Sequence, residues 1–231
     1  MHRIFRNIFF GMVSISFFIM LYFTSVQILL NSKTFFIKYY DIVNIEDKLE
    51  INSEQCYGVI KQLVDFMEGR TNKLVLEEDL LQFDSFNEDE VQHMEYVKEI
   101  YQKLIVLRNI SFILYLIMLA NFICFKFDGI RFNIIGFMFT MIILTISGVF
   151  TAINFSKFWN IFHDIIFGDK NMLFFSDSSI MINVCTYGMD KAFIFTSILL
   201  YIILSILVIG MIKKFYQLST KNCWQQNFIV V

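Results

Sequence analysis

The stretch FNIIGFMFTMIILTISGVFTAINFS, from Phe132 to Ser156, decides the fold class, because none of its side chains is charged. About 20 consecutive apolar residues are enough for a helix to cross the hydrocarbon core of a bilayer. Three further uncharged stretches of the same character run from Asn7 to Ser32, from Asn109 to Phe125 and from Ala192 to Ile212. The sequence therefore predicts an all-α integral membrane protein with four transmembrane helices.

The composition agrees with a membrane location. Of the 231 residues, 57% are hydrophobic and 17% are charged, and the mean hydropathy is +0.60. These values exclude a disordered chain and are not typical of a soluble domain. The first apolar stretch follows a basic N-terminus as in a signal peptide, but it is much longer than a typical h-region and lacks a small-residue cleavage site, so we expect an uncleaved anchor.

The positions of the charges predict the orientation. Basic residues lie close to span ends before the first span, between the second and third, and after the fourth: Arg3, Arg6, Lys126, Arg131, Lys213, Lys214 and Lys221. Because cytoplasmic loops carry the excess of Lys and Arg, we expect both termini in the cytoplasm. Of the 21 acidic residues, only Asp128 lies outside the two remaining loops, so the outer face is acidic and a poor partner for nucleic acid.

The spans divide the chain into six predicted parts. These are transmembrane helix 1 (1–32), an extracytoplasmic helical domain (33–106), transmembrane helices 2 and 3 (107–156), an extracytoplasmic loop (157–191), transmembrane helix 4 (192–212) and a cytoplasmic tail (213–231). In the outer domain, Ser53 is the expected cap of an amphipathic helix that stops at Gly69. Asn87 is the expected cap of a second helix that continues into the second span. For Lys73 to Leu81 the pattern does not decide between strand and helix.

Common catalytic and nucleotide-binding motifs are absent from the sequence. There is no G-x-G-x-x-G, P-loop, G-x-S-x-G, H-E-x-x-H or C-x-x-C motif. On the predicted topology Cys56 and Cys185 both lie outside, where a disulfide is chemically possible. Nothing in the sequence fixes their separation, so free thiols are the expectation and pairing stays open.

Two of the three histidines are candidates for chemistry. His2 adjoins the basic N-terminus, whereas His93 and His163 belong to separate outer loops that return to the same membrane surface. Taken alone, each of these is typical of a packed or interfacial histidine, and the aromatic run around His163, with Trp159, is typical of an interfacial belt. Together they offer an acid and a base near neutral pH, which suffices for acyl transfer.

A zinc site is a competing use of the same two histidines. It requires a third protein ligand, for example the carboxylate of Asp164 or Glu90. No ligand spacing supports this alternative. We expect the acidic run from Glu88 to Glu90 to be a solvated helix start.

Several short motifs resemble a known family. They are Tyr57-Gly58-Val59 with Asp65-Phe66-Met67, His93-Met94 followed by Val97-Lys98, and Phe162-His163 with Phe167 before Asp169. Together with the four spans, they resemble the lipoprotein intramolecular transacylases of Gram-positive bacteria, which are four-span membrane proteins with a helical outer domain.

The resemblance implies a cell-membrane acyltransferase. Such an enzyme moves the sn-2 acyl chain of a diacylglyceryl-cysteine lipoprotein to the α-amino group of the same cysteine, which gives a lyso-form lipoprotein. It implies that His93 and His163 are catalytic, as base, acid or acyl carrier. It further implies substrate contacts from Met94, Lys98, Phe162 and Phe167. Diacylglyceryl-modified lipoproteins and membrane lipid are the expected partners, and no cofactor is expected, because ester-to-amide transfer needs none.

Two alternatives of other classes remain at this stage. One is a non-catalytic membrane protein whose acidic outer domain binds an envelope partner. The other is a metal-assisted membrane hydrolase that uses the zinc site considered above.

Overall fold

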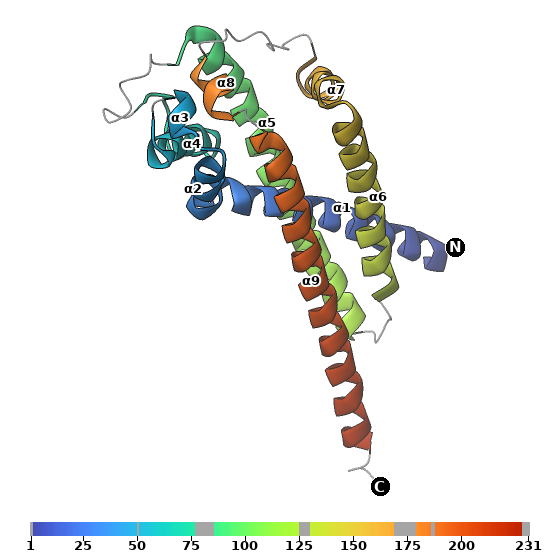
Figure 1. The fold of residues 1–231 in the computed structure, drawn as a ribbon. Helices are drawn as coiled ribbons and strands as arrows, with labels where there is room; N and C mark the ends of the chain where they lie inside the picture. Colours follow the sequence, from blue (N-terminus) through green and yellow to red (C-terminus); the bar gives the residue numbers. More distant parts are fainter. Residues whose placement is uncertain are drawn as a thin grey trace. The chain divides into compact units, whose positions relative to one another are not determined.

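The computed structural model describes residues 2–49, 51–76, 86–124, 130–168, 179–185 and 188–227, and these residues form helices and connections without any strand. In chain order (Figure 1) the helices are α1 (His2–Leu30), α2 (Lys33–Ile42), α3 (Glu46–Leu49), α4 (Ser53–Met67), α5 (Glu88–Cys124), α6 (Ile130–Ile153), α7 (Phe155–Phe167), α8 (Ile180–Cys185) and α9 (Met189–Asn227). The prediction of an all-α protein is confirmed for the described residues.

Four helices are long and apolar enough to cross a membrane, namely α1, α5, α6 and α9. This agrees with the predicted number of spans and makes the chain a multi-pass membrane protein. Helix α5 has 37 residues and is therefore about 55 Å long, well beyond the hydrocarbon core of about 30 Å. Its apolar part begins near Leu104 and its earlier turns are rich in ionisable side chains, so the residues around His93 lie outside the span. The expected continuation of an amphipathic helix into the second span is confirmed.

The chain divides into two compact units. The first unit comprises Met1–Ser25, Val106–Ser147 and Ser197–Val231. Its helices approach closely at Gly136, where an added Cβ would lie 2.6 Å from the carbonyl oxygen of Ser14. Small residues permit such close helix contacts in membranes, where interhelical packing stabilises the bundle.

Hydrogen bonds and stacked rings also connect the helices of the first unit. The Ser25 hydroxyl donates to the carbonyl oxygen of Ser197 at 3.0 Å, in a buried position. The rings of Phe17 and Tyr115 stack with centroids 3.6 Å apart, and Tyr115 donates a hydrogen bond to Asn133. These polar groups inside the bundle thus find partners, as is favourable where no water is present.

The second unit, Val26–Ile105 with Gly148–Thr196, carries both candidate histidines. Its core forms around α4, whose buried apolar residues keep a helical spacing because they occupy one face: Cys56, Val59, Ile60, Leu63, Val64 and Phe66. Phe36 and Tyr40 of α2 pack into the same core, and the Tyr40 hydroxyl donates to the carbonyl oxygen of Val184 at 3.0 Å.

The ends of α4 show why the chain turns there. The N-cap is Asn52, one residue before the predicted Ser53, because the Asn52 side chain accepts the N–H of Gln55 in a reciprocal capping box. At the other end Gly69 has φ of +75°, a left-handed conformation that favours glycine, as predicted for the stop. Beyond it, 73–76 are neither helix nor strand, and 77–81 lie outside the described residues.

Cys56 and Cys185 are free thiols in the structure. Burial raises the pKa of each thiol to about 12, with Glu90 adding to the effect at Cys185. Thiols with such pKa values are protonated at neutral pH and poorly reactive, which is typical of packed structural cysteines.

Candidate active site

The first turn of α5 is held by a capping box that positions His93. The Asn87 side chain accepts the N–H of Glu90 at 2.8 Å, and the Glu90 carboxylate accepts the N–H of Asn87 at 2.8 Å. These bonds satisfy backbone donors that the helix itself leaves free. His93 follows one turn later and is 7% exposed.

Glu90 itself corrects the expectation of a solvated acidic run. Its side chain is 1% exposed, and its second carboxylate oxygen accepts a hydrogen bond from the hydroxyl of Ser179, just before α8. Glu88 and Asp89 are exposed, as expected. The capping-box spacing Asn87-x-x-Glu90 was the available signal that this carboxylate turns back to the helix start.

Helix α7 positions the other histidine. The side chain of Asn154 accepts the N–H of Lys157 at 3.0 Å and caps the start of α7. His163 is the buried residue of this helix, with 4% of its surface exposed. Its Nδ1 lies 2.9 Å from the carbonyl oxygen of Trp159. Because a carbonyl oxygen only accepts, Nδ1 carries the hydrogen, and in the neutral ring Nε2 is left as the basic nitrogen.

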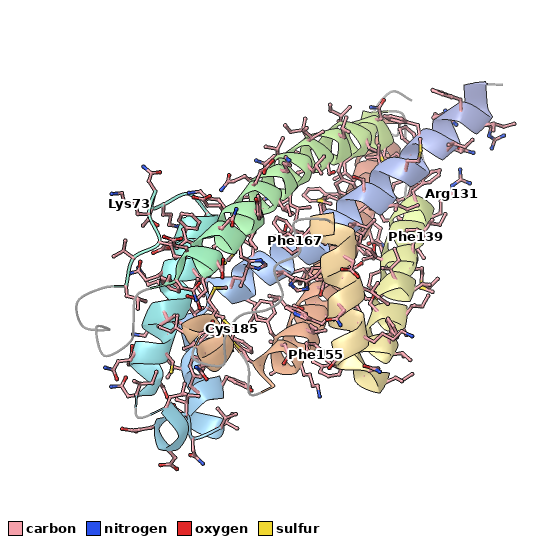
Figure 2. The ribbon with its side chains drawn as sticks, turned by 90° about the horizontal axis from the view of Figure 1, so that it is seen from above. Lys73, Arg131, Phe139, Phe155, Phe167 and Cys185 are labelled. Atoms are coloured by element: carbon pink, nitrogen blue, oxygen red, sulfur yellow. The ribbon has the colours of Figure 1, made fainter. Side chains whose placement is uncertain are left out.

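The structure brings His93 and His163 together. Their ring centroids are 6.1 Å apart and the ring planes differ by 17°. Phe167, labelled in Figure 2, lies with its ring centroid 5.2 Å from His93 and 5.3 Å from His163. The Trp159 ring lies 4.4 Å from that of His163. The two imidazoles thus share an aromatic surrounding, although their catalytic role stays a prediction.

The electrostatic environment keeps both rings neutral at pH 7. Burial lowers the pKa of His163, opposed by its hydrogen bond to the Trp159 carbonyl and by the charge of Asp164. Burial also lowers the pKa of His93, and the neighbouring His163 lowers it further, because two positive rings repel each other. A neutral imidazole is the form that accepts a proton from an amine.

The four residues that were predicted to contact the substrate lie in different environments. Met94 is buried in the core around α4. The Lys98 ammonium donates to the carbonyl oxygen of Thr71 at 3.2 Å and lies 4.2 Å from the centre of the Phe66 ring. Phe162 is exposed and adjoins His163, with ring centroids 5.5 Å apart. Among the four, Phe162 and Phe167 therefore adjoin the histidines, whereas the contacts of Met94 and Lys98 are those of packing residues.

The carboxylates considered for a zinc site do not complete one. Within 2–49, 51–76, 86–124, 130–168, 179–185 and 188–227, no group of three or more His, Cys, Asp or Glu side chains is arranged to hold a metal ion. The Glu90 carboxylate is already engaged by Asn87 and Ser179. The zinc alternative thus gains no support from this part of the chain.

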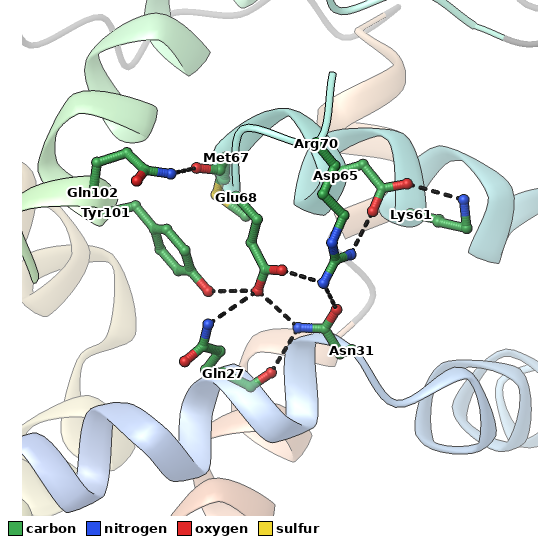
Figure 3. A network of polar contacts seen from close by, with 9 residues as sticks. All are labelled: Gln27, Asn31, Lys61, Asp65, Met67, Glu68, Arg70, Tyr101 and Gln102. Atoms are coloured by element: carbon green, nitrogen blue, oxygen red, sulfur yellow. Dashed lines mark hydrogen bonds and ion pairs between the residues drawn. The ribbon is translucent and has the colours of Figure 1, made fainter. Parts of the chain in front are cut away.

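A second polar cluster, which the sequence analysis did not find, lies at the end of α4 (Figure 3). One oxygen of Glu68 accepts hydrogen bonds from Gln27 at 3.2 Å, Asn31 at 2.9 Å and Tyr101 at 2.9 Å. Its other oxygen pairs with Arg70. Glu68 thereby joins the end of α1, the end of α4 and the middle of α5.

Arg70 extends this cluster to a second carboxylate. Its guanidinium donates to Asp65 at 2.5 Å and to Asn31 at 2.8 Å, and Lys61 also donates to Asp65 at 2.9 Å. Burial tends to raise the pKa of Asp65 and of Glu68, but their hydrogen bonds and the cationic neighbours outweigh it and hold both values below their usual range. The cluster is therefore fully charged at neutral pH and joins the helices electrostatically.

Comparisons with known proteins identify the family. The family model described as lipoprotein intramolecular transacylase Lit matches residues 11–188. Solved structures of the membrane-integral lipoprotein intramolecular transacylase Lit from Bacillus cereus are similar in fold. One is 18% identical with a TM-score of 0.77 and covers 97% of this chain and 100% of its own.

Two further structures of the Bacillus cereus protein carry a histidine-to-arginine and a histidine-to-alanine mutation. They are 17% and 16% identical, have TM-scores of 0.75 and 0.74, and each covers 95% of this chain and 94% or 95% of its own. No curated protein matches the chain. Because the family model covers most of the sequence, the protein belongs to the lipoprotein intramolecular transacylase Lit family of membrane enzymes.

Proposed function

We propose that the protein moves the sn-2 acyl chain of a diacylglyceryl-cysteine lipoprotein to the α-amino group of that same cysteine, giving a lyso-form lipoprotein. The observation that supports this most directly is the pair of buried histidines, His93 and His163, with ring centroids 6.1 Å apart. Hydrogen-bond reach is about 3 Å, so one tetrahedral centre between the rings would lie within reach of both.

In the proposed reaction His163 acts as the base through Nε2, because its Nδ1 hydrogen is held by the Trp159 carbonyl. His163 takes a proton from the cysteine amine, whose nitrogen attacks the sn-2 ester carbonyl carbon. A C–N bond forms as the C–O bond to the glyceryl oxygen breaks, and that oxygen receives the proton as a hydroxyl. His93 donates a hydrogen bond to the oxygen that bears negative charge in the transition state. Donor and acceptor belong to one molecule, so proximity supplies much of the rate enhancement.

The same proposal places the site on the extracytoplasmic face, with both termini in the cytoplasm. The support is the distribution of basic residues at the span ends, with Arg3 and Arg6 in the first turns of α1 and Lys213 and Lys214 in the later part of α9. Residues 33–106 and 157–191 would then form the extracytoplasmic parts. Membership of a transacylase family favours this proposal over the non-catalytic binding protein.

Mass spectrometry of N-terminal lipopeptides tests the activity. The protein is expressed in a host that lacks lipoprotein N-acylation, beside an empty vector and the variant His163→Ala at equal membrane abundance. We expect lyso-form lipopeptides with an N-acyl chain from the wild-type protein alone. A diacylglyceryl N-terminus with a free amine in all three samples would refute the proposal.

A further inference from the structure

Helix α7 is amphipathic, with its apolar residues gathered on one face. Successive residues of a helix are about 100° apart, so the apolar side chains of α7 other than Phe167 fall in one arc of about 160°: Phe155, Phe158, Trp159, Ile161, Phe162, Ile165 and Ile166. The opposite side carries polar residues: Ser156, Lys157, Asn160 and Asp164. Figure 2 labels the two ends of this helix, Phe155 and Phe167.

Most of the apolar face of α7, as just defined, is exposed instead of packed. Within this face Ile165 is 75% exposed, and Trp159, Ile161, Phe162 and Ile166 are exposed as well, whereas Phe155 and Phe158 are half-buried. A surface helix of a soluble unit normally does the reverse and turns its apolar stripe to the core. An exposed apolar patch of this kind marks an interaction surface.

The patch continues a surface that faces lipid. The last turn of α6, a membrane-crossing helix, exposes Val149 and Ile153, the latter to 77%. The chain leaves α6 at Asn154, whose φ of −152° and ψ of 87° are not helical, and enters α7 at the next residue. The apolar face therefore begins where a span ends, which is at the level of the headgroups.

We propose that α7 lies along the membrane surface with its apolar face inserted between the lipid headgroups and the acyl chains. Its composition fits such a position, because interfacial helices combine Trp, Phe and Ile on one face with charged residues such as Lys157 on the other. His163 lies beside Trp159 on the border between the two faces, and its depth is thereby fixed near the headgroups. This location rests on the membrane-spanning character of the chain and not on the proposed reaction.

Tryptophan fluorescence measures the depth of this face directly. The chain has two tryptophans, so Trp224→Phe leaves Trp159 as the only one. The full-length variant is reconstituted in phosphatidylcholine vesicles with bromine either near the headgroup end or near the methyl end of the acyl chain. We expect the shallow bromine to quench Trp159 more strongly than the deep one, and water-soluble acrylamide to quench it weakly.

Two other results would overturn the inference. Strong quenching by acrylamide with little effect of either bromolipid would place the face in water. Alternatively, none of the three quenchers affects Trp159 until the protein is diluted into more lipid. That result would show that a second copy of the chain covers the apolar face.

Matched variants on the two sides of α7 sharpen the test. In the Trp224→Phe background, Ile165→Glu puts a charge into the apolar face and should weaken quenching by bromolipid, whereas Asn160→Glu on the polar side should leave it unchanged. If Ile165→Glu does not accumulate, a variant that combines Trp159→Phe with Asn160→Trp places the single tryptophan on the polar side of α7. Acrylamide should quench this tryptophan more than bromolipid does. Equal quenching at positions 159 and 160 would contradict an interfacial helix with a defined depth.

Discussion

The imidazole rings of His93 and His163 lie 6.1 Å apart with nearly parallel planes, although 70 positions separate them in the chain. A capping box fixes the start of α5 one turn before His93, and the Trp159 carbonyl orients the His163 ring. Such preorganisation is what acid–base catalysis of acyl transfer requires, because the reacting groups need no rearrangement during the reaction.

Replacement of either histidine should abolish activity without loss of the protein. We expect His93→Ala and His163→Ala each to lower the rate of lyso-form production by at least about 100-fold, the size of a typical general acid–base contribution. The double variant should be little worse than either single one, because residues that act as a unit are not additive. Quantitative lipopeptide mass spectrometry checks this at equal membrane abundance, with His2→Ala as the control that keeps activity. Near wild-type activity in either single variant would remove that residue from the site.

The pH dependence of the reaction should follow the lowered pKa of the base. The pKa of His163 lies below its usual value of 6.5, so the neutral, active form persists below pH 6.5 and is lost only as the pH falls through the lowered value. Asp164 raises this pKa, so Asp164→Asn should move the acid limb of the pH–rate profile to still lower pH. A shift of the limb to higher pH in Asp164→Asn would contradict His163 as the base.

The sequence predicts those features of the structure that depend on residues close together in the chain, and it does not predict those that depend on distant residues. The four spans follow from local apolar length, and the helix limits at Gly69 and Asn87 follow from local cap chemistry. The burial of Glu90 depends on Ser179, which is distant in the sequence, so the acidic run around it has the pattern of a solvated surface.

The Glu68 cluster was missed for the same reason. The donors to Glu68 come from α1, α5 and the turns after α1 and α4, and no spacing in the sequence relates Gln27 to Tyr101. For the two histidines the sequence supplied a topological argument, because two loops on one side of a membrane converge. Their separation and the tautomer of His163 required coordinates.

Loss of the Glu68 carboxylate should destabilise the protein. Glu68→Ala leaves the donors of Gln27, Asn31 and Tyr101 without this acceptor, and such a loss costs about 1–3 kcal/mol of unfolding free energy. The matched control is Glu99→Ala, which removes an exposed pair with Lys103 and should cost less than about 1 kcal/mol. Unfolding in detergent, followed by circular dichroism, compares the two variants.

The difference in unfolding free energy between the Glu68→Ala and Glu99→Ala variants should depend on pH. The pKa of Glu68 in the folded protein is lowered from 4.5, so its stabilisation is present above pH 4.5 and is lost as the pH falls through the lowered value. Equal stability of the Glu68→Ala and Glu99→Ala variants at pH 7 would show that the cluster does not hold these helices together.

Reporter fusions test the proposed topology. The charge distribution predicts that fusions after Asn31, near Gly129, near Gly168 and after Gln217 report outside, inside, outside and inside. An alkaline phosphatase reporter is active only outside and a fluorescent protein only inside, so each site gives a positive signal with one of them. The inverted pattern at all four sites would place His93 and His163 on the cytoplasmic face, away from the proposed substrate.

The most direct test of the central claim follows individual acyl chains through the reaction. Purified protein is given two synthetic diacylglyceryl-cysteine peptides of different mass, of which one carries a deuterated chain at sn-2 and the other carries no label. We predict that the deuterated chain appears as an amide on its own peptide alone, with the sn-1 ester intact, and that His163→Ala yields no such product. Label on the other peptide, an sn-1 chain at the amine, or release of free fatty acid would contradict intramolecular sn-2 transfer.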